Sequence, residues 1–199
     1  MSSTGRAAKV QTERRLETAR HGARLLDRKQ HILVDQLDGL QPQLEAARGV
    51  GALAREAAVW LRRSAALDGS IQMEAAAPLA PATVRLRWGN TMGVRFPEDP
   101  ECDFPELPPA GGSSALSYAA STHQEALLSG LRHAVLQRQR LLLAAELAAT
   151  RTRQRAVENR WIPRLESELL EIRRQLDAQE LEESLRLRWA ADRTTASQR

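Results

Sequence analysis

Two long stretches of the chain, one on each side of its middle, carry apolar residues at spacings that alternate between three and four. On an α-helix this spacing forms a single stripe, which needs a partner helix to cover it. Gln30 is the one polar member of the first stripe, and we expect it to set the register of the pairing. The sequence therefore predicts a mainly α-helical coiled-coil protein. The stripes comprise Leu16, Ala19, Ala23, Leu26, Gln30, Leu33, Leu37, Leu40, Leu44 and Ala47 before the middle, and Leu165, Leu169, Ile172 and Leu176 after it.

Breaks in the pattern divide the chain into four parts. Asp68-Gly69 supplies a helix stop after the first stripe, and the serines at 113 and 114 supply a start before the second. The expected parts are a coiled-coil arm at residues 1–68, an insert at 69–113, a second coiled-coil arm at 114–191 and a mobile tail at 192–199.

Each arm contains one interior proline, Pro42 or Pro163. A proline inside a helix removes a backbone hydrogen bond, so we expect a bend or break near Leu40 to Gln43 and an interruption at Pro163. The two prolines lie at comparable depths from their own chain ends. Antiparallel pairing would place both at one level, as a joint between stem and foot. Beyond Pro42, the stripe is expected to resume at Ala54, Ala58, Leu61 and Ala65.

The insert changes from a helical period to a period of two, which predicts a β-hairpin. Gly89-Asn90 provides a turn signal between the two alternating runs. We expect one apolar face, packed against the helices because an isolated hairpin is marginal in water, and one arginine face. A proline-rich loop from Pro97 to Gly112 should follow, without helix and mobile. The apolar face would comprise Val84, Leu86, Trp88, Val94 and Phe96, and the arginine face Arg85, Arg87 and Arg95.

Composition narrows the class of protein. Charged residues make up 27% of the chain with both signs mixed along the same helices, and the net charge is only +4. A nucleic-acid-binding surface concentrates positive charge, so no nucleic-acid partner is expected. Cys102 is the single cysteine, which favours a reducing compartment, and no run is apolar enough to cross a bilayer. We expect a cytoplasmic protein with no direct membrane insertion.

Catalytic and metal-binding patterns are missing from the sequence. There is no glycine-rich phosphate loop, no cysteine pair and no HExxH motif. The four histidines stand ten residues apart within each pair, His21 with His31 and His123 with His133, which does not favour a metal site. Glutamates of the second arm alternate with arginines and are expected to form solvent-facing ion pairs. We therefore expect neither a metal, nor a cofactor, nor an enzymatic activity.

Five short motifs, in order, are more specific than the stripes. Residues 4–8 read TGRAA, 22–30 read GARLLDRKQ, 90–94 read NTMGV, 159–165 read NRWIPRL, and 185–190 read LRLRWA. Together they resemble the D subunits of the V-type ATPases and ATP synthases, over both arms and the hairpin.

This resemblance implies a central rotor shaft. In that family the two chain ends form an antiparallel coiled coil inside a ring of catalytic and regulatory subunits. The insert forms a foot near a smaller rotor subunit and a membrane-side adaptor. Nucleotide is bound elsewhere, so the shaft would couple ATP hydrolysis or synthesis in the head to ion movement through the membrane ring. The expected ion is the proton, and the complex would lie on the inner face of the membrane.

Polar chain ends rich in arginine suit contact with the head. The expected contact residues are Arg6, Arg14, Arg15, Arg20, Arg186, Arg188 and Trp189. For any single arginine, simple solubilisation is the competing interpretation, and for Trp189 it is packing on the N-terminal helix. Trp88 and Phe96 are expected in the core between hairpin and helices, and Trp161 in packing at the joint.

Two other functions remain open from the residues alone. A helical hairpin could bind structured RNA through the arginines of the β-hairpin, with an affinity that falls steeply with salt. A cytoplasmic scaffold coiled coil would instead associate with itself. Recovery of a large ATPase head in fixed ratio would distinguish the rotor from both.

Overall fold

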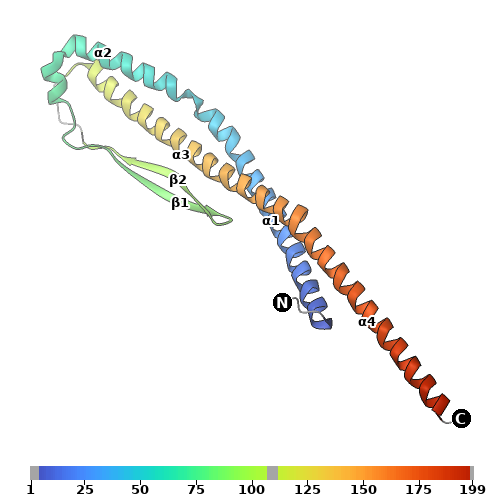
Figure 1. Cartoon of the computed structure of the whole chain (residues 1–199). Coiled ribbons are helices and arrows are strands. Elements are labelled where there is room, and N and C mark those ends of the chain that lie inside the picture. Colours follow the sequence, from blue (N-terminus) through green and yellow to red (C-terminus); the bar gives the residue numbers. More distant parts are fainter. Residues whose placement is uncertain (1–4, 107–111, 198–199) are drawn as a thin grey trace. The chain divides into compact units, whose positions relative to one another are not determined.

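The computed structural model describes residues 5–106 and 112–197. It is mainly helical with one two-stranded antiparallel sheet, which confirms the predicted fold class (Figure 1). In chain order the elements are α1 (Arg6–Ala46), the 3₁₀ turn η1 (Ala47–Gly49), α2 (Val50–Ala75), β1 (Thr83–Thr91), β2 (Val94–Asp103), α3 (Ser114–Ala156), the π-turn η2 (Val157–Trp161) and α4 (Ile162–Ser197).

The chain divides into two compact units. Residues 1–30 and 149–199 form the first, which we call the terminal unit, and residues 31–148 form the second, the central unit. Helices α1 and α3 each contribute residues to both.

The core of the terminal unit lies between the first part of α1 and the start of α4. Leu16, Leu165 and Leu169 are buried together, and Ala19 and Ile162 pack against them. Leu16 and Ala19 belong to α1, and the other three residues belong to α4. Burial of three leucines contributes roughly 2 kcal/mol each relative to exposure, which makes this cluster the main apolar contribution to the pairing.

The core of the central unit joins both long helices to the hairpin. Leu33 and Leu40 of α1 are buried against Leu143 and Leu147 of α3, and Phe96 of β2 completes the cluster. Val34, Leu37, Val94, Leu136 and Leu142 are half-buried around it. A hairpin that is marginal alone is thus held by one fully buried aromatic ring.

The apolar stripe of the first arm changes phase at η1. Ala54, Ala58, Leu61 and Ala65, where the stripe was expected to resume, are exposed, whereas Ala57 and Ser64 are buried. A 3₁₀ helix completes each turn in three residues instead of 3.6, so the residues that face the partner helix after it come earlier in the sequence. The buried positions of α2 therefore fall one residue earlier than strict continuation predicts.

Neither proline behaves as predicted in full. Helix α1 continues through Pro42 to Ala46, and the irregularity follows it at η1. Pro163 is preceded by the π-turn, in which the Ile162 N–H donates to the Val157 carbonyl, five residues earlier. The wider turn accommodates the proline ring, which would otherwise clash with the carbonyl four residues before it.

The prediction that both prolines lie at one level is wrong. In the terminal unit the partner of Arg20 is Glu166, so Pro163 lies level with residues just after Arg20 on α1. Pro42 belongs to the central unit. The prediction assumed that the start of α1 and the end of α4 lie side by side. Instead, α4 continues beyond the start of α1 (Figure 1), so equal distances from the two chain ends do not bring residues opposite each other.

The hairpin turn lies at Met92-Gly93, three residues further along the chain than the predicted Gly89-Asn90. Met92 has φ 51° and Gly93 φ 86°, and a two-residue hairpin turn of type I′ requires positive φ at both positions. Pairing of Thr91 with Val94 sets the register.

This register contradicts the prediction that all five apolar residues of the hairpin share one face. Phe96 is paired with Gly89, and Val94 with Thr91, so both lie on the face that also carries Arg85 and Arg87. Val84, Leu86 and Trp88 lie on the other face, with Arg95. Cross-strand partners always share a face, so the position of the turn decides which runs combine.

Element ends also differ from the expected boundaries. Helix α2 continues to Ala75, with a non-helical break at Gly69 (φ 72°) where the stop was expected. The neighbouring Asp68 carboxylate accepts hydrogen bonds from the Ser113 N–H and hydroxyl, at 2.9 and 2.6 Å.

Strand β2 takes in Pro97 and Pro100 of the predicted loop, and residues 107–111 of that loop lie outside the described residues. Helix α4 continues to Ser197 instead of ending at 191, and residues 198–199 are not described.

Candidate interaction surfaces

One side of the helix pair in the terminal unit carries a ladder of ion pairs. The pairs recur every seven residues on both helices, and the acidic and basic partners exchange helices at each step. Because the helices are antiparallel, a step forward on α1 matches an equal step backward on α4. The ion-pair ladder consists of Arg6–Glu180 at 3.4 Å, Glu13–Arg173 at 3.0 Å and Arg20–Glu166 at 2.7 Å.

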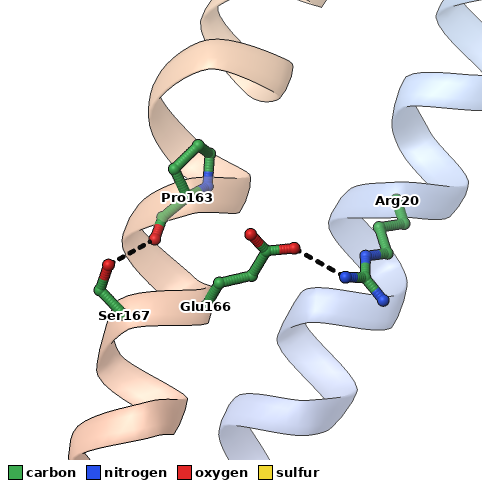
Figure 2. A network of polar contacts seen from close by, with 4 residues as sticks. All are labelled: Arg20, Pro163, Glu166 and Ser167. Carbon is green, nitrogen blue, oxygen red and sulfur yellow. Dashed lines mark hydrogen bonds and ion pairs between the residues drawn. The ribbon is translucent and has the colours of Figure 1, made fainter.

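The Arg20–Glu166 pair stands beside the proline of α4. Figure 2 shows the Arg20 guanidinium reaching Glu166 across the helix pair, while the Ser167 hydroxyl donates to the Pro163 carbonyl at 2.9 Å. The serine thereby satisfies its own hydroxyl on the preceding turn of α4. Both partners of the ion pair are about half exposed, so the pair contributes little energy alone.

The other side of the buried stripe of α1 is open. Its one interhelical ion pair among those of the described residues, Arg15–Glu168, is long at 3.8 Å. Next to it lies a groove of about 450 Å³, which we call the terminal groove. It is lined by Gln11, Arg14, Arg15, Thr18, Ala19, Gly22 and Leu26 of α1 and by Val157 and Trp161 of η2.

Trp161 is 54% exposed in the terminal groove, so the prediction that it packs at a joint is wrong. The π-turn inserts an extra residue ahead of Pro163 and rotates the tryptophan relative to the buried leucines of α4. The sequence predicted packing at the joint for Trp161, and the groove was not predicted. The available signals were Gly22 in the middle of a helix and a tryptophan two residues before a proline.

The structure separates the arginines predicted to contact the head. Arg6, Arg15 and Arg20 are engaged with glutamates of α4. Arg186 pairs with Glu182 one turn away on its own helix, at 2.7 Å. Arg14 and Arg188 have no ion-pair partner among the described residues.

The end of α4 extends past the start of α1 (Figure 1). Because Arg6 at the start of α1 lies opposite Glu180, residues 181–190 have no α1 segment beside them and are all exposed. Trp189 is 68% exposed, and Leu187 is exposed as well. Packing of Trp189 on the N-terminal helix is therefore not what the structure shows.

In the central unit the outer face of the hairpin exposes apolar side chains. Val84, Leu86 and Trp88 are all exposed, and the Arg95 guanidinium lies over the Trp88 ring at 5.8 Å. The expectation that Trp88 belongs to the core is wrong, whereas Phe96 lies there as predicted. The arginines of the opposite face are paired within the hairpin, Arg85 with Asp103 and Arg87 with Asp99.

Within residues 5–106 and 112–197, no cluster of three histidine, cysteine or acidic side chains could hold a metal ion. No helix in this part of the chain is long and apolar enough to span a membrane.

Comparison with known proteins identifies relatives over nearly the whole length. The sequence model of the ATP synthase D-subunit family matches residues 9–192. The D subunit of the A-type ATP synthase of Pyrococcus furiosus is 29% identical over 192 residues, which cover 90% of this chain and 88% of the relative. The corresponding proteins of Pyrococcus horikoshii and Pyrococcus abyssi are each 28% identical over 191 residues, with the same coverage.

Proposed function

Because this chain belongs to the ATP synthase D-subunit family and is thus a stalk component of a rotary ATPase, we propose that it acts as the central rotor shaft. In this role it couples ATP hydrolysis or synthesis in the head to ion movement through the membrane ring. The proton is the ion that we expect to move. Shaft position and nucleotide state then each shift the other, which is reciprocal coupling between distant sites.

The observation that carries this proposal is the asymmetry of the terminal unit. An ion-pair ladder covers one side of the helix pair, and an open groove with an exposed tryptophan occupies the other. A rod of this kind presents different surfaces to different subunits of a surrounding ring. Turning it would therefore favour an open or closed state at one interface at a time.

The exposed end of α4 suits a role inside the head. Residues 181–190 are helical and exposed, and Trp189 offers a large aromatic surface at that end. We assign Arg186, Arg188 and Trp189, with Arg14, to contacts with catalytic and regulatory subunits. Arg6 and Arg20, which belong to the ion-pair ladder, would instead support the pairing of the two helices.

The hairpin suits the opposite role at the foot. The exposed face of Val84, Leu86 and Trp88 is apolar and lies away from the Phe96 core. Such a face becomes favourable when a partner covers it. We assign it to the smaller rotor subunit or the membrane-side adaptor, so the chain would be a peripheral, cytoplasmic part of the membrane complex and not a membrane-inserted one.

Catalysis and cofactor binding would belong to the partner subunits. The concave, water-excluding site that catalysis requires is not expected from a helix pair with a small hairpin. This chain would bind no cofactor of its own.

Affinity purification from the source cells tests the proposal. A tagged copy of the full chain should recover the ATPase head and the smaller rotor subunit in a fixed ratio, and nuclease treatment should not reduce the yield. Recovery of RNA alone would support the RNA-binding alternative, and recovery of further copies of this chain alone would support the scaffold. Either result would contradict the rotor proposal.

A further inference from the structure

The terminal groove is bordered by one arginine without a counter-charge and by a second that is only weakly paired. The Arg14 guanidinium has no ion-pair or hydrogen-bond partner within the described residues. Arg15 has only the 3.8 Å contact with Glu168, which is too long for a strong hydrogen-bonded pair. Two neighbouring guanidinium groups therefore border one groove without a close counter-charge.

The floor of the same groove is apolar. Ala19 and Leu26 of α1 lie along it, and Val157 and Trp161 line it from η2. Trp161 leaves about half of its surface in solvent, which is costly for so large an apolar side chain unless a partner covers it. Tryptophan and arginine are both among the residues enriched in binding hot spots.

On the opposite side of the helix pair, the arginines of the ion-pair ladder are already engaged. There the ion-pair ladder brings arginines and glutamates of α1 and α4 together at 2.7 to 3.4 Å. The charges of these three pairs are neutralised within the unit. An acidic partner would therefore find Arg14 in the groove more available than the arginines of the ladder.

We propose that the terminal groove binds an acidic segment of a head subunit, which inserts one apolar side chain beside Trp161 and places a carboxylate against Arg14 and Arg15. Charge complementarity identifies the occupant as acidic, and the apolar floor requires one buried anchor. The inference rests on the proposed rotor function and adds the side of the shaft and the chemistry of the contact.

Gly22 allows the groove to be filled without disturbing the fold. A Cβ added at Gly22 would meet nothing within 4 Å, and its φ is an ordinary helical one. Gly22→Leu should thus occupy the groove, while Gly39→Leu, at a second helical glycine with equally open surroundings in the central unit, serves as the control.

The experiment measures binding of the full chain to the head complex purified without it from the same cells. Gly22→Leu and Arg14→Glu should each weaken binding by about tenfold, because one blocks the anchor and the other repels the acidic segment. Arg14→Lys should retain most of the affinity. Arg174→Glu, the same charge change at an exposed residue of α4 outside the groove, should leave it unchanged.

Photo-crosslinking identifies the occupant directly. With p-benzoylphenylalanine in place of Trp161, the adduct should map to a head-subunit peptide that contains acidic residues. Adducts confined to another copy of this chain, to RNA or to the smaller rotor subunit would overturn the inference. So would unchanged affinity in both Gly22→Leu and Arg14→Glu, even while the wild-type chain binds the head. If the wild-type chain does not bind the head, the rotor proposal itself fails.

Discussion

Phe96 and Trp88 are aromatic residues of one hairpin with opposite surroundings. Phe96 is 1% exposed in the core of the central unit, and Trp88 is 58% exposed on the outer face. Phe96→Ala should therefore destabilise the hairpin by about 3 kcal/mol, since it removes a buried ring and leaves a cavity. Hydrogen exchange of the β1 and β2 amides would measure the loss.

Trp88→Ala is the matched control for that substitution. Because the ring is mostly in solvent, exchange of the isolated chain should change by no more than about 0.5 kcal/mol. Equal effects of the two substitutions would contradict the assignment of faces.

Met92 occupies a backbone conformation that its side chain does not favour. Its φ of 51° lies in the left-handed region, and the type I′ turn prefers asparagine at this position. Met92→Asn should slow amide exchange in the hairpin by roughly 0.5 kcal/mol of opening free energy. Gly93→Ala, at the second positive φ, should do the reverse. Faster exchange in Met92→Asn would show that the turn is built differently.

At the scale of the element, the ion-pair ladder selects one register of the helix pair. A slip of one heptad along α4 would place Arg6 opposite Arg173 and Glu13 opposite Glu166. Two like-charge contacts would then replace two attractive ones. The ladder thus contributes register more than stability, because each pair is exposed and worth only about 0.5 kcal/mol.

Charge exchange within the ladder tests this role. Glu13→Arg and Arg173→Glu should each lower stability by roughly 0.5–1 kcal/mol, and the double substitution should restore most of the loss. Thermal unfolding at low salt measures the cycle, and salt at about 1 M should reduce the differences. Glu17→Arg is the control, at an exposed glutamate of α1 with no partner among the described residues. A double variant as unstable as the sum of the singles would show that the pair does not form.

The irregular turns η1 and η2 explain why a strict heptad reading fails partway along each arm. Within an unbroken helix, a residue's face follows from its spacing. The 3₁₀ turn moves the stripe of α2 onto Ala57 and Ser64, and the π-turn leaves Trp161 in the groove. Both depend on backbone hydrogen bonds that spacing does not report.

At the scale of the whole molecule, the exposed end of α4 should matter for coupling but not for the stability of the isolated chain. Deletion of residues 182–199 removes side chains that are exposed as far as residue 190, so thermal stability of the isolated chain should change little. Coupling should weaken, seen as fewer protons moved per ATP hydrolysed in vesicles that hold the assembled complex. A variant lacking only residues 198–199 is the control. Unchanged ion pumping in the longer deletion would contradict the shaft proposal.

The helical arms, the presence of the hairpin and the family follow from the sequence alone, because periodicity and short motifs are local properties of the chain. Leu16, Leu165 and Leu169 fall on the two stripes by spacing alone, and they form the core of the terminal unit. Tertiary structure decided which hairpin face is buried, how far α4 extends past α1, and which arginines are used within the helix pair. These depend on the turn position, the register of two distant helices and backbone turns of unequal width. None of them follows from spacing along one segment, because the register arises only when helices far apart in sequence meet, and the turns depend on backbone hydrogen bonds that spacing does not report.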